Sequence, residues 1–143
     1  MLKIAVDFDG TIVEDAYPEI GKQKPFALET LKKLSKMHKI ILWTCRTGEL
    51  LDNAVKYLED AGVKLHAVNA DSPDEAKQPL PDDRRYFMRK IDADLFIDDR
   101  NFNGFPGWGN IWRKLSGESD TEPEPQPKKK NGFGNKPRIF LAK

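Results

Sequence analysis

Four short apolar segments restrict the fold of this chain more than any other feature. They read "LKIAV", "KIILW", "VKLHAV" and "ADLFI", and they occupy residues 2–6, 39–43, 63–68 and 93–97. Apolar runs of this length, rich in β-branched residues, are typical of strands buried inside a sheet. The sequence therefore predicts a sheet that contains these four strands.

Helical patterns fill the intervals between the predicted strands. Residues 25–37 carry leucines at helical spacing, and Pro25 suits the first turn. Residues 49–62 place apolar side chains on one face and end in a glycine suited to a C-cap. A polar stretch over 69–83 precedes a shorter helix predicted over 84–90. Because strands alternate with helices, we expect a Rossmann-like three-layer α/β sandwich with a mainly parallel sheet covered on both faces.

Polar side chains follow each predicted strand. In sheets of this kind, ligands bind beyond the carboxyl ends of the strands. We therefore expect a functional site where these pairs meet. The pairs are Asp7 with Asp9, Thr44 with Arg46, Asn69 with Asp71, and Asp98 with Asp99.

The composition changes after about residue 115. The segment "SGESDTEPEPQPKKKNG" is rich in Pro, Glu, Ser and Lys and cannot bury a core. We therefore predict a catalytic domain over 1–115, a linker over 116–137, and a short C-terminal strand or docking segment over 138–143. A lysine run inside the linker, 128–130, is interpreted as solvated, with a nucleic-acid contact as the less favoured alternative.

The charge balance and the single cysteine exclude several protein classes. The 24 basic residues nearly match the 23 acidic ones, so no basic field favours nucleic-acid binding. One cysteine allows neither a disulfide framework nor a cysteine-based zinc site within one chain. No apolar run approaches the ~20 residues of a membrane span, and the N-terminus lacks a signal-peptide pattern. We expect a cytoplasmic protein without a membrane partner.

The acidic residues at the strand ends suggest a metal site. Asp7 and one or both of Asp98 and Asp99 are expected to converge, and like charges that close need a cation. Mg²⁺ is the usual hard cation for carboxylate, carbonyl and water oxygens. Such a site attracts phosphoryl groups, and a carboxylate beside it can act as the nucleophile. A phosphorylated substrate is therefore expected.

The same residues resemble the signatures of the haloacid dehalogenase-like superfamily, and specifically of its phosphatases. The first signature, DxDGT after an apolar run, is present as "IAVDFDGTI". An apolar strand that ends in Thr is present as "IILWT", and one that ends in DD as "LFIDD". The resemblance covers the chain from residue 2 to about residue 101.

The resemblance implies a role for each matching residue. Asp7 would be the nucleophile that forms an aspartyl-phosphate, and Asp9 the general acid and base, which favours phosphoester hydrolysis over dehalogenation. The metal ligands would be Asp7, the backbone carbonyl of Asp9, Asp98, and Asp99 directly or through water. The phosphate-binding groups would be Thr44 with Cys45 beside it, and a lysine for which Lys90 is preferred and Lys77 is the alternative.

Members of the superfamily often carry a cap domain, and the intervals here are too short for one. Between Asp9 and Thr44 there is room for a short flap and one helix, and between Thr44 and Lys90 for a helix, a strand and a polar loop. The resemblance therefore implies a capless member whose site is open to bulky substrates or covered by a neighbouring subunit. We expect a homo-oligomer, and a small or a macromolecular substrate.

Two other functions are alternatives to a phosphatase. A signalling receiver module also uses an acidic cluster, but its phosphoacceptor would end a central strand in mid-chain, where this sequence offers only Asp71. A non-catalytic phosphate-binding module would retain the fold without turnover. A cysteine phosphatase is excluded, because its arginine would lie six positions after Cys45, where the chain has Leu51.

Three further groups of residues receive ordinary structural interpretations. Arg46 is expected to be solvated, with contact to a substrate as the alternative. His38 and His66 have no partner at a metal-ligand spacing. Trp108 and Trp112 are interpreted as packing residues, with an interface or substrate rim as the alternative.

Overall fold

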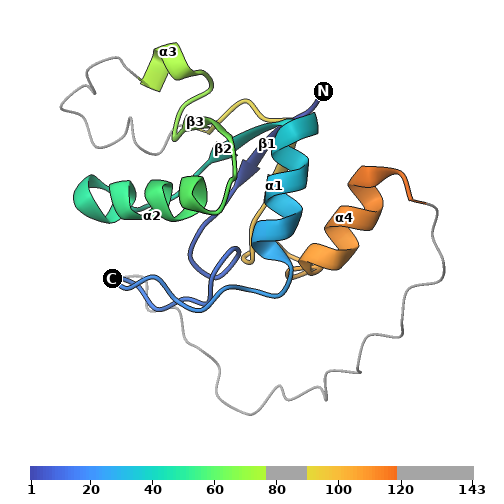
Figure 1. The fold of residues 1–143 in the computed structure, drawn as a ribbon, viewed down its shortest axis with the longest axis horizontal. Coiled ribbons are helices and arrows are strands. Elements are labelled where there is room, and N and C mark those ends of the chain that lie inside the picture. Colours follow the sequence, from blue (N-terminus) through green and yellow to red (C-terminus); the bar gives the residue numbers. More distant parts are fainter. Residues whose placement is uncertain (77–89, 119–143) are drawn as a thin grey trace.

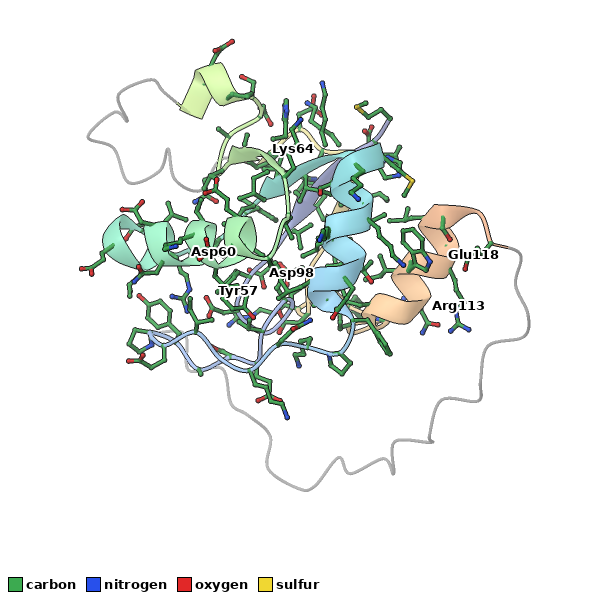
Figure 2. All side chains as sticks on the ribbon, viewed as in Figure 1. Tyr57, Asp60, Lys64, Asp98, Arg113 and Glu118 are labelled. Carbon is green, nitrogen blue, oxygen red and sulfur yellow. The ribbon has the colours of Figure 1, made fainter. Side chains whose placement is uncertain are left out.

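The computed structural model describes residues 1–76 and 90–118 (Figures 1 and 2). Within these two ranges, the sheet consists of four parallel strands in the order β3-β2-β1-β4. The strands are β1 (Lys3–Val6), β2 (Lys39–Leu42), β3 (Leu65–Val68) and β4 (Leu95–Ile97). All four predicted strands are confirmed, with ends that differ by one or two residues. The fold is the expected Rossmann-like α/β architecture.

The register aligns the carboxyl ends of the strands. Val6 pairs with Leu42 on one side and with Ile97 on the other, and Leu42 pairs with Val68. The residues that follow these positions therefore leave the sheet at the same edge. This is the edge at which the polar pairs were predicted to meet.

The two long predicted helices are confirmed. They are α1 (Ala27–Met37) and α2 (Gly48–Asp60). Helix α1 begins two residues after Pro25, because Phe26 takes a left-handed conformation (φ 63°) at the N-cap. Gly62 (φ 82°) follows the end of α2, where a glycine suits the left-handed backbone.

Two helices were not predicted from the sequence. The four-residue α3 (Pro73–Ala76) lies within the polar stretch. The nine-residue α4 (Trp108–Ser116) begins with Trp108, for which the sequence predicted a packing role but no helix. Figure 1 shows α4 beside α1, and the two helices are in contact. The helix predicted over 84–90 lies outside the described residues except for Lys90, as do the C-terminal segment and most of the linker.

The main hydrophobic core joins one face of the sheet to α1, α2 and α4. Val6 and Leu42 point into this core, together with Leu34 of α1, Leu58 of α2 and Ile111 of α4. A smaller cluster on the other face combines Ala5, Ile41, Ala67 and Ile91. Within 1–76 and 90–118, no cap domain covers the sheet edge, and no helix has the length and apolar character needed to cross a membrane.

Candidate functional site

The chain leaves β1 through a tight turn that fixes the first polar pair. The Asp7 backbone N–H donates to the carbonyl of Ile97 (3.0 Å), and the Phe8 carbonyl accepts from the N–H groups of Thr11 and Ile12 (3.2 and 3.0 Å). Gly10 has a φ of 87°, and a Cβ at this position would lie 2.5 Å from the Asp99 carboxylate. The glycine therefore allows the turn to approach the end of β4.

Three carboxylates meet at this turn. Oxygen atoms of Asp7, Asp98 and Asp99 all lie within 4.8 Å of one another. The Thr11 hydroxyl lies 3.1 Å from Asp7 Oδ2 and 3.0 Å from Asp99 Oδ1, and it accepts the Asp99 backbone N–H (2.9 Å). Because the hydroxyl has one proton, it donates to one carboxylate at a time. The predicted convergence of the aspartates is therefore present, and Thr11 links two of them.

The pKa of Asp7 is raised to about 7. Burial is the largest cause, followed by the negative charge of Asp98 and by a hydrogen bond with Asp99. Bonds from the Thr11 hydroxyl and the Phe8 backbone oppose the shift. A divalent cation would remove the repulsion, and three carboxylates are a suitable donor set for a hard cation. The cluster could therefore hold a metal ion.

This electrostatic arrangement predicts how stability depends on pH and metal. The folded pKa of Asp7 lies above its ordinary value of 3.8, so between that value and about pH 7 the folded state binds more protons than the unfolded state. The stability that protonated Asp7 contributes to the metal-free protein is therefore lost as the pH rises through about 7. Added Mg²⁺ is expected to raise the thermal midpoint more at pH 8 than at pH 5. A ligand at a hundred times its Kd contributes about 2.7 kcal/mol.

Differential scanning fluorimetry in EDTA and in Mg²⁺ at both pH values measures this effect. NaCl at equal ionic strength is the control, because it screens charges without occupying the cluster. A midpoint that Mg²⁺ leaves unchanged at pH 8 would contradict a metal site at these aspartates.

The loop after β2 lies next to Asp7 in the sheet. The Trp43 N–H donates to the carbonyl of Val6 (2.9 Å). The Thr44 N–H donates to Asn69 Oδ1 (2.8 Å), and the Thr44 hydroxyl accepts the Arg46 N–H (3.1 Å). Asn69, in a left-handed conformation (φ 49°) after β3, thus braces the loop. Among the residues that the structure describes, the Thr44 hydroxyl donates to no acceptor, so its proton could serve an anion.

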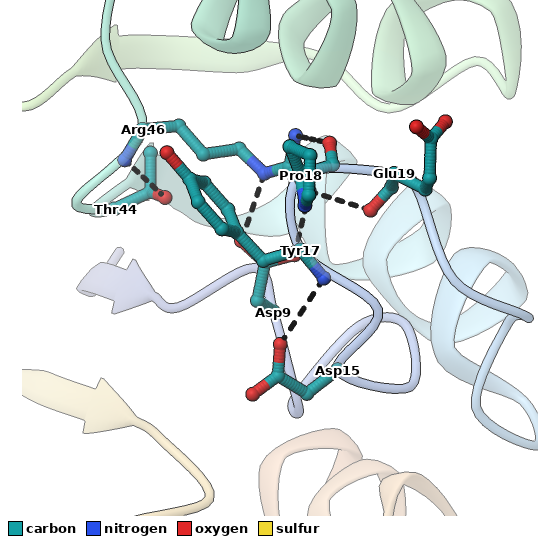
Figure 3. Close-up of polar contacts among 7 residues, drawn as sticks. All are labelled: Asp9, Asp15, Tyr17, Pro18, Glu19, Thr44 and Arg46. Carbon is teal, nitrogen blue, oxygen red and sulfur yellow. Dashed lines mark hydrogen bonds and ion pairs between the residues drawn. The ribbon is translucent and has the colours of Figure 1, made fainter.

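The expectation that Arg46 is solvated is wrong. Its side chain is 1% exposed and forms a two-point ion pair with Asp9, from Nε to Oδ2 (2.8 Å) and from Nη2 to Oδ1 (2.7 Å). Figure 3 shows the guanidinium reaching Asp9 and the carbonyls of Pro18 and Glu19. The hydrogen bond to Asp9 is the main reason why the pKa of Arg46 is raised above its ordinary value. These four hydrogen bonds replace the water that the side chain loses.

The other predicted phosphate-binding residues are less closely tied to the cluster. Cys45 is an exposed free thiol beside Thr44. Lys90 is exposed, with its ammonium 5.5 Å from the centre of the Phe96 ring. Its role in phosphate binding stays a prediction, and Lys77 lies outside the described residues.

The hydrogen bonds by which two residues support the site were not predicted from the sequence. Thr11 belongs to the first signature, but its sequence position did not predict that its hydroxyl joins two carboxylates. Trp108, 1% exposed, donates from Nε1 to the Thr11 carbonyl (2.8 Å) and so fixes the turn from α4. A buried tryptophan needs an acceptor for its indole N–H, so the predicted packing role of Trp108 implied a hydrogen bond of this kind. The packing role predicted for Trp108 is confirmed.

A comparison with known proteins places the chain in a family. No protein-family model and no curated protein matches it. The solved structure of a conserved protein from Bacteroides thetaiotaomicron is similar to it, with 47% sequence identity and a TM-score of 0.69. The match covers 83% of this chain and 93% of that chain. The chain therefore belongs to the same family as the Bacteroides protein.

Proposed function

We propose that the protein is a Mg²⁺-dependent phosphomonoester hydrolase of the haloacid dehalogenase-like superfamily. The observation that carries this proposal is the cluster of Asp7, Asp98 and Asp99 at the carboxyl edge of the sheet, beside the Thr44 loop. A half-buried carboxylate flanked by two others can hold a divalent cation and present an oxygen to a bound phosphoryl group.

Each residue of the site has a step in the proposed reaction. An Asp7 oxygen attacks phosphorus, and the bond from phosphorus to the ester oxygen breaks as Asp9, which enters this step in its protonated form, gives its proton to the leaving alcohol. Asp9 then takes a proton from water, the water oxygen attacks the aspartyl-phosphate, and inorganic phosphate leaves with Asp7 restored. Thr44 donates to a phosphoryl oxygen. When bound, the cation at Asp7, Asp98 and Asp99 neutralises the phosphoryl charge.

The order of the strands argues against the receiver alternative. A receiver would carry its phosphoacceptor at the end of a central strand in mid-chain. Here the mid-chain strand β3 lies at one edge of the described sheet, whereas β1, which precedes Asp7, is internal. Asp71, the receiver candidate, accepts the backbone N–H of Asp92 (2.7 Å). The position of β1 is the one that suits a nucleophile at Asp7.

A turnover assay tests the proposal. The purified protein is incubated with p-nitrophenyl phosphate and with a panel of nucleotides, sugar phosphates and 5′- or 3′-phosphorylated oligonucleotides, in Mg²⁺ and in EDTA. We expect repeated release of inorganic phosphate that EDTA abolishes and added Mg²⁺ restores. Phosphate release that stops after one equivalent per protein, or that is equal in EDTA, would contradict the proposal. The preferred panel member identifies the substrate class.

A further inference from the structure

A loop over residues 12–24 rises from the turn that carries Asp9, and its base is held by the backbone. The Glu14 N–H donates to the Lys22 carbonyl (2.7 Å), and the Lys24 N–H donates to the Ile12 carbonyl (2.9 Å). A Cβ at Gly21 would lie 2.0 Å from the Glu14 carbonyl oxygen, so the two sides of the loop approach closely. We call residues 15–20 the loop tip.

Arg46 forms hydrogen bonds that join the loop tip to the body of the protein, and Ile20 at the end of the tip also packs against the main core. Arg46 Nη1 donates to the carbonyl of Pro18 (3.1 Å) and its Nη2 to the carbonyl of Glu19 (2.9 Å). The guanidinium carbon also lies 5.3 Å from the centre of the Tyr17 ring. Among the hydrogen bonds that join the described residues, these two connect the tip to the rest of the chain. Arg46 comes from the loop after β2, which also carries Thr44 (Figure 3).

The same guanidinium holds both oxygens of the Asp9 carboxylate. A guanidinium is a rigid planar group, so its donors to Asp9 and to the tip cannot move independently. The Phe8 ring, 5.1 Å from the guanidinium carbon, packs on it as well. Removal of either set of acceptors would leave two hydrogen-bond donors of a buried guanidinium unsatisfied, which is costly. The positions of Asp9 and of the tip are therefore coupled through one side chain.

We propose that Arg46 is a positioning residue that couples the docked loop tip to the orientation of Asp9. The proposal builds on the proposed function, because it assigns Asp9 the acid and base role in phosphoester hydrolysis. When the tip is docked, Asp9 is held towards the Thr44 loop. When the tip leaves, Asp9 loses its fixed orientation. The contribution of Asp9 to turnover therefore depends on Arg46.

A double-mutant cycle tests this coupling. Arg46→Gln, Asp9→Asn and the double variant are compared with the wild type for kcat and KM on an alkyl phosphate. General acid–base catalysis contributes about 10²–10⁴-fold, so we expect Asp9→Asn to lose that much kcat. Arg46→Gln should lose part of the same factor, and the double variant should be no slower than Asp9→Asn. Losses of kcat that multiply would overturn the proposal.

Two further variants separate positioning from charge and from general stability. Arg46→Lys keeps the charge but not the planar two-point geometry, and we expect its kcat to fall like that of Arg46→Gln. The matched control is Lys56→Gln, which removes an exposed ion pair of the same 2.7 Å length, to Asp60 on α2. It should leave kcat unchanged. Full kcat in Arg46→Lys would overturn the positioning role.

Amide hydrogen exchange decides the same question without turnover. Exchange over residues 15–20 should become faster in both Arg46→Gln and Asp9→Asn, and should stay unchanged in Lys56→Gln. Unchanged exchange over residues 15–20 in Asp9→Asn would overturn the coupling. Because Asp9→Asn is nearly isosteric, its exchange can be measured even if Arg46→Gln does not fold. If the wild type hydrolyses no substrate, the proposed function fails, while the exchange result still decides whether Arg46 joins Asp9 to the tip.

Discussion

Replacement of Asp7 by asparagine is expected to reduce phosphate release by at least about 10⁴-fold, because the amide cannot form the aspartyl-phosphate. The carboxylate oxygens of Asp7 have no equivalent at the site, since Asp98 and Asp99 follow the neighbouring strand. The measurement is kcat/KM with saturating Mg²⁺ on the preferred substrate of the panel. Trapping of the acyl-phosphate in the wild type, and its absence in the variant, would accompany the loss.

The stability of the same variant distinguishes lost chemistry from lost structure. Burial and the charge of Asp98 raise the pKa of the Asp7 carboxyl to about 7. Asparagine at this position removes the negative charge that is unfavourable there. At pH 8 in EDTA, the thermal midpoint of Asp7→Asn should therefore be no lower than that of the wild type. Asp60→Asn is the matched control, because it changes an exposed aspartate at the end of α2. An Asp7→Asn variant that keeps full activity would contradict the proposed chemistry.

The parallel sheet could be predicted because each strand is a short, mostly apolar run that is followed by a polar pair. Burial in a parallel sheet favours that pattern. In the structure, the last residues of the four strands, Val6, Leu42, Val68 and Ile97, are aligned in register. Helix α4 was not predicted, because "GWGNIW" contains two glycines and offers little helical propensity. Its stability comes from tertiary packing of Trp108 and Ile111, which a local pattern does not encode.

The candidate site was predictable to the extent that it follows from strand ends. Asp7, Asp98 and Asp99 converge because their strands are adjacent and in register, which topology alone implies. The burial of Arg46 was not predictable in this way. It depends on the backbone carbonyl groups of Pro18 and Glu19. Every residue has a backbone carbonyl, so the amino-acid sequence does not indicate which loop carbonyls will accept hydrogen bonds.

Replacement of Trp108 by alanine is expected to destabilise the protein by about 3–5 kcal/mol, as large aromatic-to-alanine changes in cores do. Trp108 is 1% exposed and packs edge-to-face on Phe105, with ring centres 5.8 Å apart. The variant also leaves the buried Thr11 carbonyl without the indole N–H. Because domains are stable by about 5–15 kcal/mol, this loss is a large share of the total. Urea denaturation monitored by circular dichroism measures it.

Two companion variants show whether the tryptophan also supports the metal site. Trp108→Phe keeps most of the packing and loses the hydrogen bond to the Thr11 carbonyl, at a cost of about 1–3 kcal/mol. Because Thr11 links Asp7 to Asp99, this variant should weaken the rise in thermal midpoint that Mg²⁺ produces at pH 8. Trp112→Ala changes a partly buried tryptophan of the same helix, whose ring centre lies 4.9 Å from the Lys33 ammonium. Among the hydrogen bonds of the described residues, the one from α4 to the Thr11 carbonyl comes from Trp108. Trp112→Ala should cost less than half as much stability as Trp108→Ala and leave the Mg²⁺ effect intact. Equal losses in the two alanine variants would show that α4 contributes general packing and does not hold the turn at Thr11.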